Sequence, residues 1–243
     1  MDLIYGRNAV REALRGRRRV HSLLVAQGEK REALEHDLRA WCAKFDRDLP
    51  PVAFTSTSEL TARLNTAEHQ GVAAVVDPYE YVGSDEVLRN FSLLVALDEV
   101  QDPHNLGAII RSAEAAGAAV VIPRHRAAEV TPAVVKASAG ATEHAAVSQV
   151  RNLSDFLANA RSAGFWIYGA VPGAAAVYYD EDYTYPTCFV LGSEGEGLGR
   201  RVASFCDVLV SVPLLGKISS LNVSVCTALL LFEAVRQRQC KQG

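Results

Sequence analysis

The 243-residue sequence predicts an α/β fold in which a small amino-terminal α/β domain precedes a larger domain with a mostly parallel sheet. Apolar, strand-like runs alternate with helical patterns along most of the chain, which is typical of parallel sheets covered by helices on both faces. A polar stretch over residues 78–90, with Pro78, Gly83 and several acidic residues, separates the two regions and is expected to be a linker.

The amino-terminal domain is expected to span residues 1–77. Three of its segments have apolar residues at helical spacing: residues 6–14, 30–45 and 57–64. Short apolar runs bounded by turn residues predict three strands: residues 20–26, 52–54 and 71–76. About eighty residues in this pattern are enough for a small domain that folds by itself.

The larger domain is expected to span residues 91–243. Apolar runs predict six strands: residues 92–97, 118–122, 144–147, 165–170, 187–191 and 208–212. Helices are expected between and after them: residues 106–116, 132–139, 153–163, a short helix around Val202, and 221–239. The last helix is apolar on nearly its whole circumference, whereas a surface helix has one apolar stripe. We therefore expect a homodimer in which a second copy covers part of this helix.

The composition excludes several classes of protein. The amino terminus lacks the apolar core of a signal peptide, and no uncharged apolar run approaches the ~18 residues of a membrane span. The five cysteines are widely spaced, without a Cys-x-x-Cys pair or a Cys/His cluster, so neither a disulfide framework nor a metal site is expected. These features favour a cytoplasmic protein with reduced thiols.

Arginines crowd the amino terminus, although the net charge of the chain is −3. Such a cluster is often only a solvated face, but arginine also suits bidentate contact with phosphate. The functional interpretation is that the amino-terminal domain binds RNA through one basic surface. The candidate RNA-binding residues are Arg7, Arg11, Arg17, Arg18 and Arg19.

Two glycine- and serine-rich turns stand near the carboxyl terminus, at residues 191–199 (LGSEGEGLG) and 212–225 (VPLLGKISSLNVSV). Each follows an apolar strand and precedes a helix. Loops at the carboxyl ends of parallel strands carry the sites of α/β folds, and glycines let the backbone approach a ligand closely. Tight turns without a ligand are the alternative, but two such turns, each with a lone Glu, Ser or Asn, favour a site.

A third group of polar residues follows the strand at 92–97. It contains Asp98, Asp102, His104 and Asn105, with Arg111 on the next helix. Asp102 or Asn105 alone is more simply explained as a helix cap. Arg111 is harder to explain structurally, because it stands in a helix of alanines and isoleucines.

Several familiar sites do not fit these motifs. The first turn lacks the Gly-Lys-Ser/Thr ending of a P-loop, and no Gly-x-Ser-x-Gly elbow occurs. The spacing gives no support to a triad of Ser220, His104 and Asp98. A Rossmann glycine loop follows the first strand of its domain, whereas only one strand and one long helix are expected after Gly199.

Three motifs, taken in order, resemble those of the SpoU (TrmH) family of RNA ribose 2′-O-methyltransferases, which belong to the SPOUT superfamily. They are Asn105-Leu106-Gly107 with Arg111, Leu191-Gly192-Ser193-Glu194-Gly195, and Val212-Pro213-Leu214 with Ser220-Leu221-Asn222-Val223-Ser224-Val225. The amino-terminal region, at residues 5–10 and 70–72, is similar to the ribosomal-protein-like RNA-binding module of the bacterial enzymes that act on a guanosine of 23S rRNA.

The resemblance implies a deep trefoil knot at the carboxyl terminus, with S-adenosylmethionine as the cofactor. The implied cofactor contacts are Gly192, Val212, Leu214, Ser220 and Leu221. The implied catalytic residues are Arg111, Asn105, Glu194, Ser220 and Asn222. The resemblance also implies a homodimer in which each active site is completed by the second copy, and no metal, because the sulfonium methyl group is already activated.

The expected activity is methylation of a ribose 2′-hydroxyl in RNA, on a guanosine of 23S rRNA. Arginine stays protonated, so Arg111 is expected to orient phosphate and stabilise the developing alkoxide rather than to act as a base. The general base stays open, with Ser220 as one option for relaying the proton. The alternatives are a tRNA ribose 2′-O-methyltransferase and a catalytically silent RNA-binding protein on the same scaffold.

Overall fold

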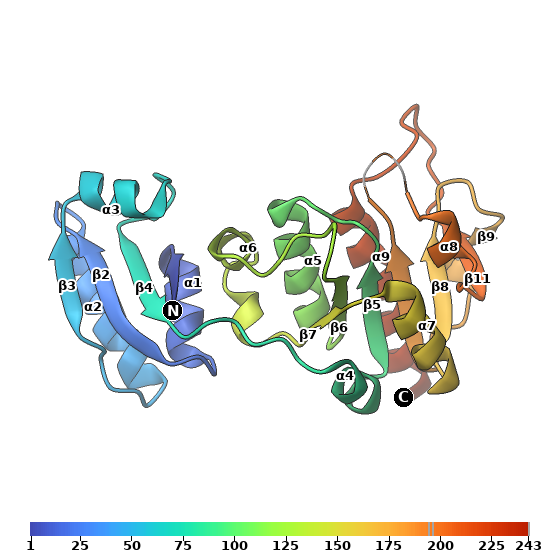
Figure 1. Ribbon diagram of the computed structural model, residues 1–243, viewed down its shortest axis with the longest axis horizontal. Coiled ribbons are helices and arrows are strands. Elements are labelled where there is room, and N and C mark those ends of the chain that lie inside the picture. Colours follow the sequence, from blue (N-terminus) through green and yellow to red (C-terminus); the bar gives the residue numbers. More distant parts are fainter. Residues whose placement is uncertain (194, 196, 243) are drawn as a thin grey trace. The chain divides into compact units, whose positions relative to one another are not determined.

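The computed structural model describes residues 1–193, 195 and 197–242 and divides the chain into two compact units (Figure 1). The first unit combines Met1–Glu80 with Val130–His144, and the second combines Tyr81–Glu129 with Ala145–Gly243. Each unit has its own sheet with helices on both faces, so the predicted α/β class is confirmed. Residues 130–144 lie within the region predicted as the larger domain, yet they pack with the amino-terminal elements.

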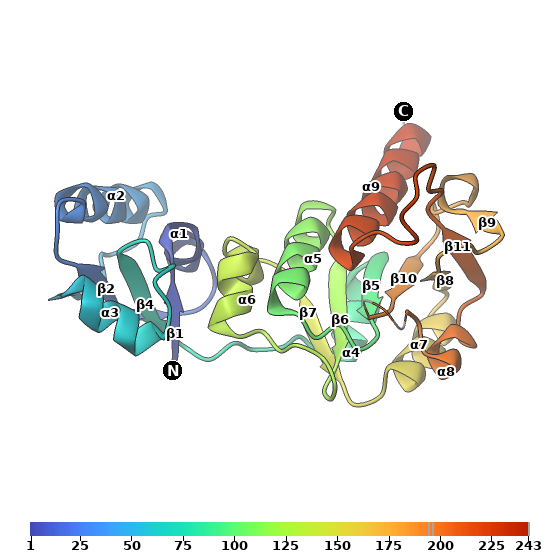
Figure 2. The ribbon, with the colours of Figure 1, turned by 90° about the horizontal axis from the view of Figure 1, so that it is seen from above.

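The first unit is built on a mixed four-stranded sheet in the order β1-β4-β2-β3. The strands are β1 (Asp2–Tyr5), β2 (Val20–Ala26), β3 (Val52–Thr55) and β4 (Val72–Val76). The helices before β4 are α1 (Arg7–Arg15), α2 (Arg31–Lys44) and α3 (Thr57–Leu64). Figure 2 shows α1 and α2 on one face of the sheet and α3 on the other. Strand β1 is not apparent in the sequence pattern, because its four residues are too few to establish a period.

Residues 130–144 form the helix α6 (Pro132–Ala137) and the short 3-10 helix η1 (Ala141–Glu143), which pack on α1 and β1. The fully buried carboxylate of Glu143 accepts a hydrogen bond from Nε of Arg18 at 2.9 Å. The Arg18 guanidinium also lies 5.6 Å from the ring centroid of Tyr79. A buried charge of this kind is tolerated because it is paired, and loss of one partner leaves the other uncompensated.

Glu12 forms a second polar contact between α1 and this segment. From this contact we predict that the first unit loses stability in acid. Its carboxylate lies 2.9 Å from Nε2 of His144 and 2.8 Å from Arg11. Burial alone would raise the pKa of Glu12, but the hydrogen bonds and charges of His144 and Arg11 outweigh it and hold the pKa below 4.5. The unfolded chain therefore binds more protons as the pH falls below about 4.5, and stability is lost in that range.

The test is the variant Glu12→Gln, with Glu32→Gln on the exposed start of α2 as the control. At pH 7 the first change is expected to lower the free energy of unfolding by about 1.5–3 kcal/mol, the range for hydrogen bonds to charged groups. Urea unfolding at pH 7 and at pH 4 should show this difference shrinking in acid. A constant difference at both pH values would contradict the assignment.

The second unit is built on a seven-stranded parallel sheet in the order β7-β6-β5-β10-β8-β11-β9. Its strands are β5 (Leu93–Leu97), β6 (Ala119–Pro123), β7 (Val147–Val150), β8 (Trp166–Ala170), β9 (Ala176–Val177), β10 (Thr187–Leu191) and β11 (Val208–Ser211). All five residues of β5 and of β10 are buried. This continuous apolar pattern arises because helices cover both faces.

The helices of the second unit lie in two layers. They are α4 (Ser84–Asn90), α5 (Pro103–Ala115), α7 (Leu153–Ser162), α8 (Arg200–Ala203) and α9 (Val223–Gln242), with the 3-10 turn η2 (Tyr178–Asp180). Figure 2 shows α5 and α9 on one face of the sheet and α4, α7 and α8 on the other. No described helix is long and apolar enough to span a membrane.

Other elements also differ from the sequence prediction. Part of the expected linker is the helix α4, whose Val87 is fully buried in the core beneath α7. Strand β7 begins at Val147 rather than at residue 144, because His144 closes the segment that packs in the first unit. The predicted trefoil knot stays a prediction.

The carboxyl-terminal helix α9 is buried on one side and exposed on another. Leu230, Leu231 and Ala234 are fully buried, and α9 packs against α5 and β10. Val225, Leu229 and Phe232 are 49%, 36% and 48% exposed. These three lie at positions i, i+4 and i+7, so they form one apolar stripe, which we call the α9 stripe.

Candidate active site

The loops that carry the three predicted motifs leave the same edge of the second unit's sheet. Strands β5, β10 and β11 belong to one parallel sheet, so the loops after them begin at their carboxyl ends. The loop after β5 leads into α5, and the loop after β11 leads into α9, which packs against α5. Figure 1 shows the β11–α9 loop projecting from this edge. The fold therefore gathers sequence-distant motifs as the pattern predicts.

The turn after β10 folds tightly on itself. Ser193 and Gly197 form an isolated bridge, in which the Gly197 N–H donates to the Ser193 carbonyl at 3.0 Å. A Cβ on Gly192 would lie 2.0 Å from the carbonyl oxygen of Gly197. Glycine at 192 is therefore required by the packing of the turn itself. Glu194, which the motif resemblance places in the catalytic group, and Glu196 lie outside the described residues.

Asp98 fastens this turn to the neighbouring strand. Its backbone N–H donates to the Leu191 carbonyl at 2.8 Å, and its carboxylate accepts from the Gly199 N–H at 2.9 Å. Burial raises the pKa of Asp98 and repulsion by Glu99 adds to the rise, while the bond from Gly199 opposes it. The sequence pattern assigns Asp98 no role. The sequence signal that could have identified Asp98 is its position directly after a buried strand, at the sheet edge where a glycine turn also begins.

The loop between β11 and α9 exposes apolar side chains and backbone N–H groups to solvent. Leu215 is fully exposed and Ile218 is 62% exposed. Among the described residues, the backbone N–H groups of 214–221 donate no hydrogen bond to another part of the chain. The predicted cofactor residues Leu214 and Leu221 are half-buried, and Ser220 is exposed. Apolar side chains beside unused backbone donors are features that a bound ligand would cover.

Asn105 and Asn222 join the amino-terminal ends of α5 and α9. Nδ2 of Asn222 donates to Oδ1 of Asn105 at 2.9 Å, and Asn105 is buried. Oδ1 of Asn222 also accepts from the Ser224 N–H at 2.9 Å, which caps α9. The cap of α5 is Asp102, which accepts from the His104 N–H at 2.9 Å. The structure thus brings two of the predicted catalytic residues into direct contact.

Arg111 lies on the exposed side of α5, in line with the exposed residues His104 and Ala115. No hydrogen bond or salt bridge between described residues engages its guanidinium. Asn105 lies about 120° away around the helix, given 100° per residue. The Arg111 guanidinium is therefore accessible to a ligand that binds this face of α5.

The predicted RNA-binding arginines divide into paired and exposed residues. Arg18 is 10% exposed and bonded to Glu143, and its expected contact with RNA stays a prediction. Arg7 pairs with Asp37, and Arg11 pairs with Glu12. Arg17 and Arg19 are exposed.

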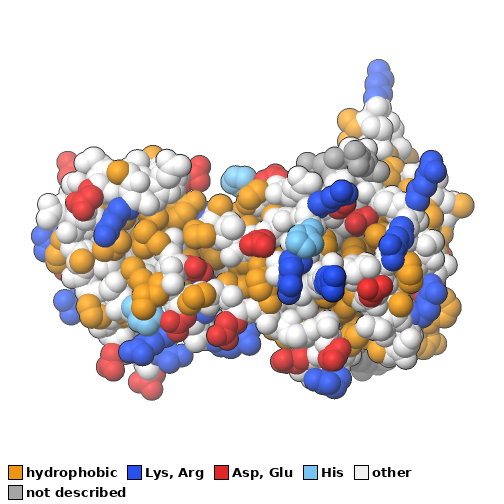
Figure 3. Space-filling model, viewed as in Figure 1, with side chains coloured by type: hydrophobic (Ala, Val, Ile, Leu, Met, Phe, Trp, Pro, Cys, Tyr) orange, Lys and Arg blue, Asp and Glu red, His pale blue; other side chains and the backbone are white. Residues whose placement is uncertain are grey.

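The second unit carries further basic residues that the sequence analysis does not single out. Arg124, Arg126, Arg200 and Arg201 are exposed, and Figure 3 shows Lys and Arg side chains spread over the visible face of this unit. Arg126 pairs with Glu99 at 3.2 Å. A few arginines in a loop or in the four-residue helix α8 are too few to show a sequence period, so only exposure in the fold distinguishes them.

Comparison with known protein families assigns both parts of the chain. Residues 92–232 match the SpoU rRNA methylase family. The chain belongs to this family. Residues 3–82 match the RNA 2′-O ribose methyltransferase substrate-binding family. The resemblance of the three motifs to the SpoU family is therefore confirmed, and the chain combines the methylase and substrate-binding modules of RNA methyltransferases.

Relatives of known sequence and structure agree with this SpoU assignment. A Synechocystis protein described as a tRNA/rRNA methyltransferase is 40% identical over 98% of the chain, which spans 63% of that protein's length. A Staphylococcus epidermidis protein described as a TrmH family tRNA/rRNA methyltransferase is 37% identical over 97% of the chain and 96% of its own length. The SpoU methyltransferase AviRb of Streptomyces viridochromogenes, crystallised with AdoMet, superposes with a TM-score of 0.77 at 27% identity, covering 98% of this chain and 90% of its own.

Proposed function

We propose that this protein transfers a methyl group from S-adenosylmethionine to a ribose 2′-hydroxyl of RNA, on a guanosine of 23S rRNA. The observation that carries the reaction class is the succession of the two family matches, substrate-binding module first and SpoU methylase second. In this proposal residues 1–77 bind RNA, residues 91–243 hold the cofactor and catalyse, and the protein acts in the cytoplasm. The relatives' descriptions include tRNA as well as rRNA, so tRNA is the second candidate substrate.

The residues at the sheet edge fit S-adenosylmethionine. Backbone donors without a partner in the described chain lie at 214–221, beside the apolar side chains of Leu214 and Leu221. The turn at Gly192 is closed on itself and held by Asp98, which gives a firm wall for a ligand. We therefore assign the cofactor to Gly192, Val212, Leu214, Ser220 and Leu221. When bound, S-adenosylmethionine supplies an electrophilic methyl group.

The protein's task is to align and activate the ribose hydroxyl. Alignment within a closed site can contribute about 7–11 kcal/mol to lowering the barrier. We assign Arg111 to the RNA phosphate beside the reacting ribose, where its fixed charge also stabilises the developing alkoxide. The bonded pair Asn105 and Asn222 holds the helix ends on either side. Ser220 is the candidate for passing on the hydroxyl proton, and Glu194 completes the proposed catalytic group.

Nucleoside mass spectrometry tests both the reaction and its substrate. The purified full chain is incubated with S-adenosylmethionine carrying a labelled methyl group and with unmodified total rRNA or total tRNA. Labelled 2′-O-methylguanosine in 23S rRNA is the expected product. Label only in tRNA would replace the rRNA assignment by the second candidate, and label in neither RNA would favour the catalytically silent RNA-binding protein.

A homodimer is also part of this proposal, and it rests on the α9 stripe. Val225, Leu229 and Phe232 leave a continuous apolar face exposed in the amino-terminal half of α9. Soluble monomers rarely leave large apolar patches uncovered. The same stripe on a second copy offers a self-complementary partner, as two-fold symmetry requires.

The variant Phe232→Lys is therefore expected to convert the dimer into a monomer, because it places a charge within the proposed apolar contact. Sedimentation equilibrium of the full chain at micromolar concentration measures the change. The full chain is preferable to a fragment of residues 91–243, because residues 130–144 pack with the first unit. Trp166→Lys, at an equally exposed aromatic residue outside the stripe, is the control. A monomeric wild-type chain would contradict this assignment.

A further inference from the structure

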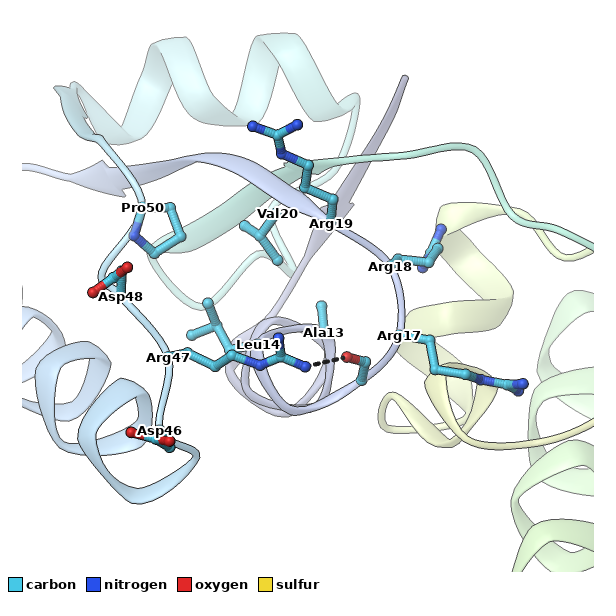
Figure 4. A pocket seen from close by; sticks show the side chains of 11 residues that line it. Ala13, Leu14, Arg17, Arg18, Arg19, Val20, Asp46, Arg47, Asp48 and Pro50 are labelled. Carbon is cyan, nitrogen blue, oxygen red and sulfur yellow. Dashed lines mark hydrogen bonds between the residues drawn. The ribbon is translucent and has the colours of Figure 1, made fainter.

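The first unit contains a cavity of about 410 Å³ between the α1–β2 connection and the α2–β3 connection (Figure 4). Its volume lies in the range of small-ligand sites, roughly 300–1,000 Å³. Leu14, Val20 and Pro50 contribute an apolar floor. The cavity is formed entirely by residues outside the proposed methyl-transfer site.

One side of the cavity carries positively charged side chains. Arg17 and Arg19 lie along the α1–β2 connection, and both are exposed. Among the described residues, no salt bridge engages either guanidinium, whereas Arg18 between them is held by Glu143. Figure 4 shows the two side chains extending in different directions from the backbone, so both guanidinium groups reach one phosphodiester by rotation about their exposed side-chain bonds.

The opposite side accepts hydrogen bonds. Asp46 and Asp48 lie on the α2–β3 connection, across the cavity from Arg17 and Arg19, as Figure 4 shows. The helices α1 and α2 also end here, so their carbonyl ends add negative potential. Arg47 takes one of these acceptors, since its Nη2 donates to the Gly16 carbonyl at 3.4 Å.

We propose that this cavity binds one unpaired nucleotide of the RNA substrate. Arg17 and Arg19 hold its phosphate, the base lies over Val20 and Pro50, and Asp46 and Asp48 accept hydrogen bonds from the N–H groups of the base edge. The inference rests on the proposed RNA methyltransferase function, because it takes RNA as the ligand.

The cavity has positive charge on one side and hydrogen-bond acceptors on the other. This combination favours a nucleotide over a bare anion or a simple cation. The aspartates and helix carbonyl ends repel a bare anion, and the arginines repel a simple cation. A nucleotide carries an anionic phosphate at one end and N–H donors at the other. Single-stranded RNA is recognised in this way, through the base edges of unstacked nucleotides and contacts to phosphate. Guanine presents adjacent N–H groups to a carboxylate and uracil does not, so guanine should be preferred.

Fluorescence anisotropy with two labelled pentaribonucleotides, UUGUU and UUUUU, tests this preference on the full chain. UUGUU is expected to bind about tenfold more tightly, which is the discrimination typical of a bidentate base contact. In the double variant Asp46→Asn with Asp48→Asn, the preference should disappear while UUUUU binds at least as well as before. Asn tolerates the positive φ of 52° at residue 46.

The double variant Arg17→Gln with Arg19→Gln should weaken both oligonucleotides by the same factor and keep the preference for guanine. The salt dependence of binding should flatten by about 0.7 in the log–log slope, since the two arginines hold one phosphate and each phosphate neutralised on a single strand contributes about 0.7. Arg39→Gln and Glu32→Gln, at exposed positions of α2 outside the cavity, are controls of the same charge sign, each with half the change in net charge.

Equal binding of the two oligonucleotides by the wild-type chain would overturn the inference, as would a guanine preference that survives the aspartate changes. Failure of the proposed function is seen separately, in the labelled-methyl assay with total RNA. Methyl transfer without a guanine preference would reject the assignment of the cavity to a nucleotide and leave the proposed methyltransferase function intact. A guanine preference without methyl transfer would support the cavity and reject the methyltransferase.

Discussion

Replacing Arg111 by alanine is expected to reduce methyl transfer to RNA by about 100- to 1,000-fold, the cost of removing one group that stabilises charge in a transition state. The affinity for S-adenosylmethionine should change little. Arg111 lies on α5, whereas the proposed cofactor residues lie in the turn after β10 and in the β11–α9 loop. Single-turnover assays and calorimetric titration with S-adenosylhomocysteine measure the two quantities.

The exposure of Arg111 should confine the effect to catalysis. No salt bridge between described residues fixes its guanidinium, so alanine removes a charge without leaving a buried partner unpaired. Folding should therefore be unaffected, and the loss should appear in the chemical step. Arg111→Lys tests the geometry further, because lysine keeps the charge but lacks the planar fork that suits phosphate.

Arg89→Ala on α4 is the matched control, since Arg89 is also an exposed arginine of the second unit. It should leave both quantities unchanged. An Arg111→Ala variant that loses affinity for S-adenosylhomocysteine as strongly as it loses activity would contradict the proposed division between catalysis and cofactor binding.

The alternating α/β pattern was readable from the sequence because helices cover both faces of the second unit's sheet. Its central strands therefore appear as continuous apolar runs, such as β5 and β10, and each helix fills the interval between two strands. Short elements were not readable. Strand β1 has four residues, β9 has two, and α4 lies in a stretch whose proline, glycine and acids are typical of a linker. Burial of Val87 in tertiary structure decides that segment, and a local pattern cannot report it.

The motifs of the candidate site were readable because each stands directly after a predicted strand. Their mutual contacts were not, because they join residues far apart in sequence. The bond between Asn105 and Asn222 and the bond between Asp98 and Gly199 each span more than a hundred residues. The pairing of Arg18 with Glu143 was not readable for the same reason, since the two residues are distant along the chain.

Replacing Gly192 by valine is expected to abolish binding of S-adenosylmethionine, and even alanine should weaken it severely. A Cβ at this position would lie 2.0 Å from the Gly197 carbonyl oxygen and 2.4 Å from the Leu198 nitrogen. These are backbone atoms, so no side-chain rotation relieves the clash, and the turn must open. The Asp98–Gly199 bond that holds the turn against β5 resists this opening. The cofactor would then lose the wall that the closed turn provides.

Calorimetric titration with S-adenosylhomocysteine compares Gly192→Ala and Gly192→Val with Gly83→Val. A Cβ on Gly83 would meet no atom within 4 Å, and the backbone conformation there is an ordinary one, so that control should bind as the wild type does. Overpacking costs about 1–3 kcal/mol of stability, and thermal unfolding in the same buffer shows that each variant is folded at the titration temperature. A folded Gly192→Val variant with wild-type affinity would show that the turn after β10 is a structural element remote from the cofactor, and the assignment of that turn to the site would fall.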